Sequence, residues 1–292
     1  MGANDYVIIT DSTSDLPIEI INALGIYVVP MPFTLSGVNY LHYPDGRELD
    51  INEFYARLRL GDESFTTLIN TQSYIEYFEP IINAKNHILY ISFSSALSGS
   101  YNSSLLAANE LMEKYPKSKI ICIDSKAASL GEGLLVYSAA MKKEEGFELE
   151  ELGEWITNNR SQLCHWFTVA DLNYLKRGGR VTAMSATVGT ALNIKPILHV
   201  DDEGYLKLID KVRGRKRALK SLVDHMIETS INPEEQTIFI GHGGNLYDSE
   251  LLVELIKDKI NVKNVIINNI GPTIGTHSGP DTIALFFFGS KR

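Results

Sequence analysis

Residues 94–100 read Ser-Ser-Ala-Leu-Ser-Gly-Ser and carry more hydroxyl groups than a helix cap requires. They follow an apolar run that predicts a strand and precede a stretch that predicts a helix. The backbone N–H groups and the dipole at such a helix start favour an anion. The sequence therefore predicts that an anionic ligand group is bound here by Ser94, Ser95, Ser98 and Gly99. The alternative is an ordinary capped helix start.

Two further segments carry cationic or donor side chains beside glycines. Residues 176–180 read Lys-Arg-Gly-Gly-Arg, in which the glycines permit a tight turn and Arg180 can bind a carboxylate or phosphate bidentately. The alternative is a solvated surface turn. Residues 270–280 place Thr276 and His277 in a Gly- and Pro-rich stretch between two apolar runs. Histidine can donate to an anion in either charge state, so we expect a rigid loop that presents both residues to a ligand.

Residues 10–15 read Thr-Asp-Ser-Thr-Ser-Asp and fit either a helix cap with a turn or a ligand-facing loop. A carboxylate is a poor contact for an anion, so Asp11 is expected to orient a neighbour. A second hypothesis uses the same residues differently. A serine of residues 94–98, His277 as base and Asp11 as orienting group would make a serine hydrolase or acyl transferase. A nucleophile elbow is not present, because Ala96 stands two residues before Ser98.

Other chemistries lack their motifs. The sequence contains no P-loop and no Gly-x-Gly-x-x-Gly segment, which disfavours ATP and dinucleotides. Its seven histidines show no metal spacing, and Cys122 and Cys164 form no C-x-x-C pair. We therefore expect no cofactor and no metal.

The first half alternates short apolar runs with amphipathic stretches, which predicts a mainly parallel sheet with helices on both faces. Asp15 is the expected cap of a first helix, while Asp50 with Glu53 and Ser73 with Glu76 predict capping boxes for two more. The remaining expected elements are strands at 7–9, 27–29, 87–93 and 119–124, and helices at 101–114 and 133–143.

The second half predicts a mixed sheet with an antiparallel part. Residues 201–204, Asp-Asp-Glu-Gly, lie between apolar stretches and indicate a hairpin. A helix is expected over 215–228, and strands over 166–169, 237–240, 265–267 and 282–288. The sequence thus predicts a two-domain α/β protein, with an N-terminal domain at 1–165 and a C-terminal domain at 166–292.

The composition narrows the partners. The 292 residues carry a net charge of −9, which argues against nucleic acid as a partner. The densest basic stretch, residues 211–220, fits a solvated helix start, or else a docking surface for an acidic partner. No apolar run approaches ~20 residues, so stable membrane insertion is not expected. Free thiols in apolar runs suit a reducing compartment, and we expect a cytoplasmic protein.

Four segments, taken in this order, resemble the DegV family across essentially the whole chain. The matching stretches are residues 9–16, 94–101, 175–181 and 271–280. The resemblance implies a two-domain α/β fold that binds a long-chain fatty acid and has no catalytic activity of its own. Some members present the bound acid to a separate ATP-dependent fatty acid kinase, which phosphorylates the carboxylate.

The same resemblance implies a role for individual residues. Thr66 and one of Ser94 or Ser95 should bind the carboxylate, with Arg180 and His277 nearby. The chain departs from the family pattern after Thr66, where residues 67–73 read Thr-Leu-Ile-Asn-Thr-Gln-Ser in place of the family's Ser-Gln-Pro-Ser. This departure concerns the hydrogen bond that the loop would make to the ligand, and the acyl chain that the protein would prefer.

A buried carboxylate must be paired or well hydrogen-bonded, whereas the tail contributes ~0.8 kcal/mol per buried CH₂. The tail therefore needs a tunnel lined by apolar residues. The alternative is that the candidate residues belong to the ordinary core of the second domain. The candidate lining residues are Ala191, Leu192, Ile194, Ile197, Leu198, Phe286 and Phe288.

Overall fold

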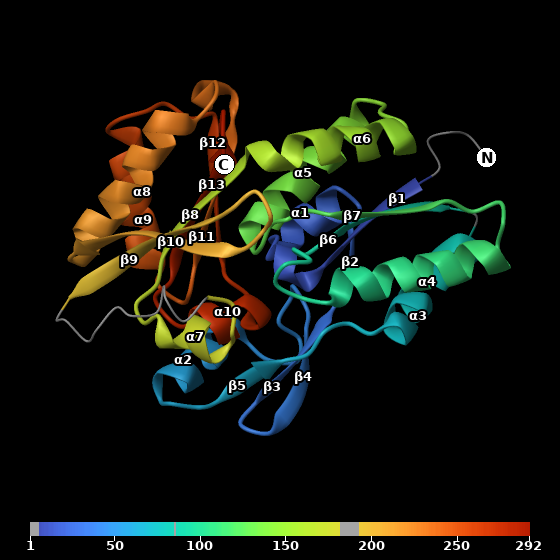
Figure 1. Cartoon of the computed structure of the whole chain (residues 1–292), viewed down its shortest axis with the longest axis horizontal. Coiled ribbons are helices and arrows are strands. Elements are labelled where there is room, and N and C mark those ends of the chain that lie inside the picture. The colour runs from blue at the N-terminus through green and yellow to red at the C-terminus, as the bar shows by residue number, and fades with distance from the viewer. Residues whose placement is uncertain (1–5, 85, 182–192) are drawn as a thin grey trace.

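The computed structural model describes residues 6–84, 86–181 and 193–292. The chain forms two principal β-sheets with a long helix, α5, between them (Figure 1). A third, three-stranded sheet lies below both in that view. Within the described residues, no helix is long and apolar enough to cross a membrane, and no three His, Cys, Asp or Glu side chains are grouped to hold a metal ion.

The first sheet is entirely parallel, as the alternating pattern of the first half predicts. Its strands run in the order β2-β1-β6-β7, and their bounds are Tyr27–Val29, Tyr6–Asp11, His87–Ser92 and Ile120–Asp124. Helices α3 (Thr71–Asn83) and α4 (Ser100–Lys114) cover one face. Helices α1 (Ile18–Ala23), α5 (Leu130–Glu144) and α6 (Leu149–Asn159) pack on the other. The prediction of a parallel sheet with helices on both faces is confirmed.

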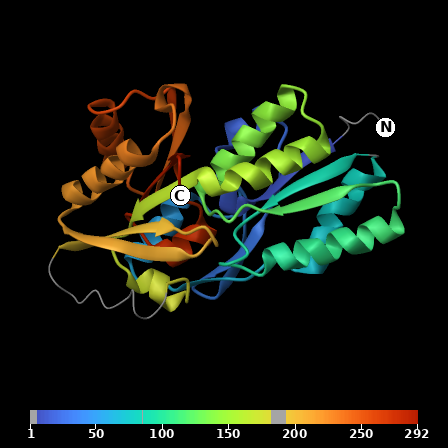
Figure 2. The same cartoon turned by 45° about the horizontal axis from the view of Figure 1, so that its top comes forward.

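The second sheet is mixed and has six strands in the order β10-β9-β8-β13-β11-β12. Only β11 and β12 pair in parallel. Its outer face packs against α8 (Arg215–Thr229) and α9 (Leu246–Lys257), as Figure 2 shows. The strands are β8 (Leu163–Thr168), β9 (Ile194–Val200), β10 (Leu206–Arg213), β11 (Thr237–His242), β12 (Asn264–Asn269) and β13 (Ile283–Phe288).

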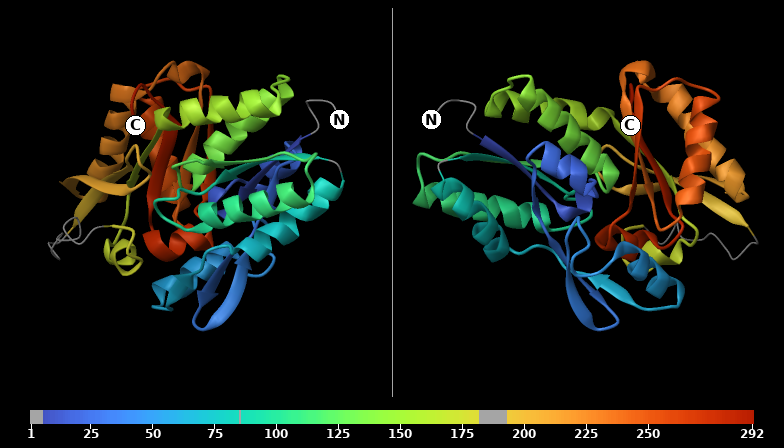
Figure 3. Two further views of the ribbon diagram at one scale, coloured as in Figure 1. Left: turned by 45° about the vertical axis from the view of Figure 1, so that its right-hand side comes forward. Right: turned by 180° about the vertical axis from the view of Figure 1, so that it is seen from behind.

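The third sheet comes from the first quarter of the chain and packs against a helix near residue 275. Its strands, in the order β4-β3-β5, span Val38–His42, Met31–Leu35 and Ser64–Thr66. Together with α2 (Ile51–Arg59) it packs against α10 (Pro272–Ser278), next to α7 (Asn173–Arg177). Figure 3 shows these elements grouped at one end of the second sheet. Short 3-10 turns occupy Ser12–Ser14, Arg160–Gln162 and Pro233–Glu235.

Helix α5 contributes to the cores of both large sheets. Its small and apolar residues pack against β1 and β6 on one side and against β8, β11 and β13 on the other. Every strand of the second sheet starts at or after Leu163. The domain boundary near residue 165 agrees with that change of sheet and stays a prediction.

Three local expectations were wrong. Asp15 is not the cap of α1; it ends the 3-10 turn at 12–14 with a left-handed backbone (φ 52°), and α1 begins three residues later, after Pro17. Asn70, not Ser73, caps α3, because its side chain accepts from the N–H of Ser73. Residues 272–278 form helix α10 rather than a rigid loop. Pro272 lies in the first helical turn, where a backbone N–H has no partner within the helix, so the N–H that proline lacks costs no hydrogen bond. The hairpin around residues 201–204 is confirmed.

Candidate functional site

A cavity of about 450 Å³ lies between the inner face of the second sheet and the loops that follow β5, β6 and β7. Its volume falls in the range of ordinary ligand sites. Side chains of β8 and β13 form one wall, while α10 and the loops form the other. Most of the lining is apolar, and the polar groups are few, which suits a ligand with a long apolar part.

Thr66 and His277 form a pair at the partly exposed end of this cavity, here called the mouth. The Thr66 hydroxyl lies 2.7 Å from Nε2 of His277. Thr66 ends β5, and its pairing with Phe33 on β3 fixes its position. His277 lies on α10, which packs against β3 and β5. Two segments 211 residues apart are thus joined at a point where a ligand could share their hydrogen bonds.

His277 is uncharged near neutral pH. Burial, together with the nearby charge of Arg180, lowers its pKa from 6.5 to about 4. On its other side the ring faces Gly178, where an added Cβ would overlap Nδ1 of His277. Gly178 therefore allows close packing against the imidazole, whereas Gly179 has a positive φ of 69° with no atom near an added Cβ. A neutral ring can still donate one hydrogen bond to a carboxylate.

Arg180, Ser98 and Gly99 also line the cavity. The Arg180 guanidinium is half-buried; its Nε donates to the carbonyl of Leu97 at 3.3 Å, and another nitrogen donates to the carbonyl of Gly178. Burial lowers the pKa of Arg180 from its usual value. Gly99 and Ser98 precede α4, and an added Cβ on Gly99 would lie 3.3 Å from Leu68. These residues place one cation and one hydroxyl beside the Thr66–His277 pair.

The structure places Ser94, Ser95 and Thr276 away from the cavity lining. Ser94 is buried, and its hydroxyl donates to the carbonyl of Gly204 at 3.1 Å. The Ser95 hydroxyl donates to the Asp124 carboxylate at 2.6 Å. Thr276 donates to the carbonyl of Pro272 within α10. Of the predicted ligand residues, the structure brings Thr66, Ser98, Gly99, Arg180 and His277 together.

The serine-hydrolase arrangement is not assembled. Among the described residues, no recorded hydrogen bond joins a serine of residues 94–98 to His277. Asp11 lies elsewhere, where its carboxylate accepts from Thr13, from the Tyr90 hydroxyl at 3.0 Å and from the Phe93 N–H at 3.1 Å. Asp11 thereby fixes the start of the serine loop, since Phe93 directly precedes Ser94.

The inner wall carries part of the expected tail lining. Phe286 lines the cavity together with Ala284 and Phe167, whereas Leu198 packs in the same core without lining it. Ile197 points to the opposite face and packs with α8. Ile194 and Phe288 are not among the lining residues. Ala191 and Leu192 lie outside the described residues.

A family model described as an uncharacterised protein of the DegV family matches residues 5–290. The chain is also 43% identical, over 287 residues, to a DegV domain-containing protein of Clostridium perfringens, and the match covers 98% of each chain. The chain belongs to the DegV family. The resemblance found from the four segments is confirmed.

Solved DegV structures share the whole fold. A DegV protein of Thermus thermophilus, described by its fatty acid binding, matches with a TM-score of 0.88 at 29% identity, over 98% of this chain and 99% of that one. A DegV lipid-binding protein of Thermotoga maritima matches with a TM-score of 0.86 at 26% identity, over 99% of both chains. The α/β fold, with one parallel and one mixed sheet, is therefore that of DegV proteins.

The sequence did not reveal a network of buried acidic and hydroxyl groups around Glu132. Glu132, on α5, lies 2.7 Å from the Thr10 hydroxyl and 2.9 Å from the Thr13 hydroxyl. Both hydroxyls also contact other acceptors, the Ile91 carbonyl and Asp11. Two hydroxyl protons cannot serve four acceptors, so the carboxyl groups of Glu132 and Asp11 should together carry at least one proton. Burial, and then the charge of Asp11, raises the pKa of Glu132 well above its usual value.

Ser129 is a second residue that sequence reasoning missed. It lines the cavity just before α5 and has φ 54° and ψ −145°, a conformation that serine rarely adopts. Its hydroxyl donates to Asp15 at 2.5 Å. Burial raises the pKa of Asp15 well above its usual value. The signal available in the sequence was the run of small residues at 127–129, Ala-Ala-Ser, directly before the helix.

Proposed function

We propose that this DegV protein binds a long-chain fatty acid, with its carboxylate at the mouth and its tail in the cavity. One observation carries the proposal: an apolar cavity opens at the Thr66–His277 pair, with Ser98 and Arg180 beside it. Relatives with the same fold, at 26% and 29% identity, are described as lipid- or fatty-acid-binding. A long acyl chain with one anionic end matches this distribution of polarity.

The energetics favour such a ligand. A carboxylate taken out of water needs hydrogen-bond donors, and hydrogen bonds to a charged group contribute about 1.5–3 kcal/mol each. Each buried CH₂ contributes about 0.8 kcal/mol, so a chain of lipid length outweighs the cost of association. The head group thus fixes orientation, while the tail supplies most of the affinity.

We further propose that the chain presents the carboxylate to a fatty acid kinase in the cytoplasm and has no catalytic activity of its own. The mouth residues are partly exposed, so a bound head group would stay accessible to a partner. Arg180 is the cation at that opening. It could contact the partner or the phosphate that the partner transfers.

Native mass spectrometry of the protein purified from a bacterial host tests the binding. We expect a co-purified mass in the range of common fatty acids. After delipidation, the protein should take up oleate or palmitate at one molecule per chain. A mass equal to that of the chain alone, with no uptake of either acid, would contradict the proposal.

Arg180→Gln should reduce phosphorylation of the bound acid by a partner kinase about tenfold or more, while the protein still takes up oleate. The reason is that a charge-assisted contact to an anion is lost at the mouth. Arg177→Gln is the matched control, because Arg177 lies in the same turn but stacks on Tyr174, 4.6 Å from its ring centroid. The measurement is the rate of acyl phosphate formation with saturating kinase.

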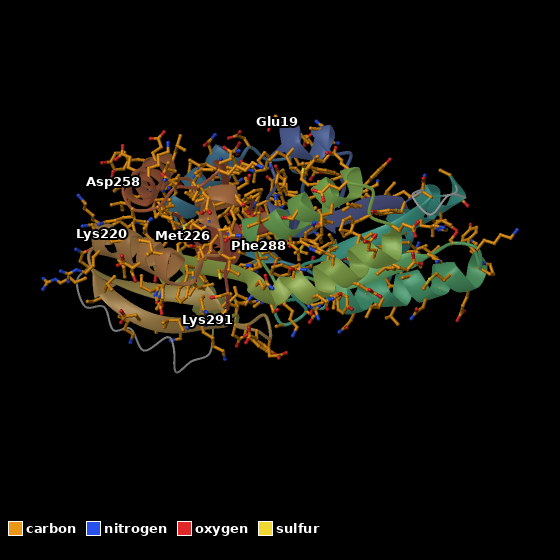
Figure 4. All side chains as sticks on the ribbon, turned by 90° about the horizontal axis from the view of Figure 1, so that it is seen from above. Glu19, Lys220, Met226, Asp258, Phe288 and Lys291 are labelled. Atoms are coloured by element: carbon orange, nitrogen blue, oxygen red, sulfur yellow. The ribbon has the colours of Figure 1, made fainter. Side chains whose placement is uncertain are left out.

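Equal rates for the wild type and Arg180→Gln would contradict this role. The basic residues at the end of β10 and in the first half of α8 would then be the next region to test. They include Arg213, Arg217 and Lys220, and none of them lines the cavity. Figure 4 labels Lys220 on this outer helix, at the end of the molecule away from α4.

A further inference from the structure

The buried end of the cavity coincides with one row of side chains across the second sheet. His165 on β8 pairs with Phe286 on β13, and Val200 on β9 pairs with Leu206 on β10. The register between β8 and β9 puts His165 opposite Val200. All four residues line the cavity, and His165, Val200 and Phe286 are almost completely buried. This row therefore lies away from the exposed mouth.

The next row along the same face closes the cavity. Leu163 pairs with Phe288, each two residues beyond the row of His165, and side chains two apart share a face. Both pack in the core around α5, and neither lines the cavity. Arg292 covers this end, because its Nε donates to the Leu163 carbonyl at 2.8 Å. Figure 4 labels Phe288 near the middle of the view.

The His165 ring is fixed on three sides. Its Nδ1 lies 3.1 Å from the Leu163 carbonyl, and its plane meets the Phe286 ring edge-on, with centroids 5.4 Å apart. An added Cβ on Gly131 would overlap Nε2 of His165 and lie 2.9 Å from Phe286. The ring is thus wedged between β13 and the first turn of α5. Burial lowers its pKa well below 6.5, so it presents no charge to an apolar chain.

We propose that His165, wedged between Phe286 and Gly131, is the stop that sets the longest acyl chain this cavity accepts. The proposal rests on the proposed function, because it takes the tail of a fatty acid to run from the mouth toward β8. Interiors are close-packed, so a chain longer than the available space must leave carbons outside or displace the ring. Chain length would then be decided by the space around one imidazole.

Two substitutions should shift the preference in opposite directions. His165→Ala removes the ring and should favour acids longer by about two carbon atoms, which at ~0.8 kcal/mol per CH₂ changes the ratio of bound acids by about tenfold. The Leu163 carbonyl keeps its bond from Arg292 in this variant. Gly131→Ala forces the ring toward the cavity and should favour shorter acids. Delipidated protein is offered an equimolar mixture of myristate, palmitate, stearate and arachidate, and native mass spectrometry reads the bound distribution.

Two further variants separate volume from other effects. His165→Phe refills the space, so it should show no shift toward longer acids. His199→Ala removes a histidine from the neighbouring strand that does not line the cavity, and should leave the distribution unchanged. An unchanged distribution of bound acids in His165→Ala would overturn the proposal that His165 limits chain length. The same shift toward longer acids in His165→Phe would also overturn it. Failure of the wild type to take up any of the four acids would instead overturn the proposed function.

Discussion

Thr66→Val combined with His277→Phe should weaken oleate binding about a hundredfold. Both changes keep the size of the side chain and remove its hydrogen-bonding group. A carboxylate left with fewer donors loses about 1.5–3 kcal/mol per bond, which corresponds to roughly 10- to 100-fold for each. Isothermal titration of delipidated protein with oleate gives the affinities of the two single variants and the double variant.

The two single changes should not be additive, because the two side chains are hydrogen-bonded to each other at 2.7 Å. We expect the double variant to lose less than the sum of the single losses. Thr237→Val, at the start of β11 and away from the cavity, is the control for a threonine-to-valine change. Wild-type affinity in the double variant would show that the carboxylate lies elsewhere in the cavity.

Asp11→Ala should lower the free energy of unfolding by about 4 kcal/mol. The change leaves buried donors on Thr13, Tyr90 and Phe93 without their acceptor, and each such group costs about 1–3 kcal/mol. The side chain of Asp11 is itself fully buried, so these donors have no contact with bulk water. Urea unfolding followed by circular dichroism measures the loss.

Asp11→Asn should fall between the wild type and the alanine variant, because it keeps one acceptor oxygen. Glu110→Ala, at an exposed position on α4, is the control and should change stability by less than about 0.5 kcal/mol. If Asp11→Ala unfolded at the same urea concentration as Glu110→Ala, the network would not stabilise the fold.

Local sequence patterns predicted most of the strands and the outer helices. The apolar run at 283–288 is buried along most of its length, as a strand covered on both faces should be. Where a pattern fitted two kinds of local structure, the prediction was wrong. Gly and Pro in residues 271–279 indicated a loop, yet Pro272 starts α10 and Gly275 allows the close approach of Tyr55, whose hydroxyl would lie 2.7 Å from an added Cβ.

The site was predicted only in part, because its arrangement depends on tertiary contacts. The serine loop was rightly placed before a helix, but which hydroxyl faces the cavity depends on distant partners. Ser94 is engaged by Gly204 and Ser95 by Asp124, contacts that span 110 and 29 residues. No local pattern records such partners. Glu132 was missed because one acid in a helix sequence gives no sign that the hydroxyls of Thr10, on β1, and Thr13, in the turn after it, lie beside it.

The pairing of β5 with α10 has a consequence for the order in which the molecule is made. All strands of the parallel sheet lie within the first 124 residues and can pair while the rest of the chain is still being synthesised. The mouth cannot form at that stage, because its hydrogen bonds join residues that are far apart in the chain. The pairs are Thr66 with His277, Ser64 with Thr276 and Tyr55 with Ile270, separated by 211, 212 and 215 residues. Such distant contacts form slowly. If the chain binds a fatty acid as we propose, a nascent chain should therefore bind it only after residues 270–277 have left the ribosome.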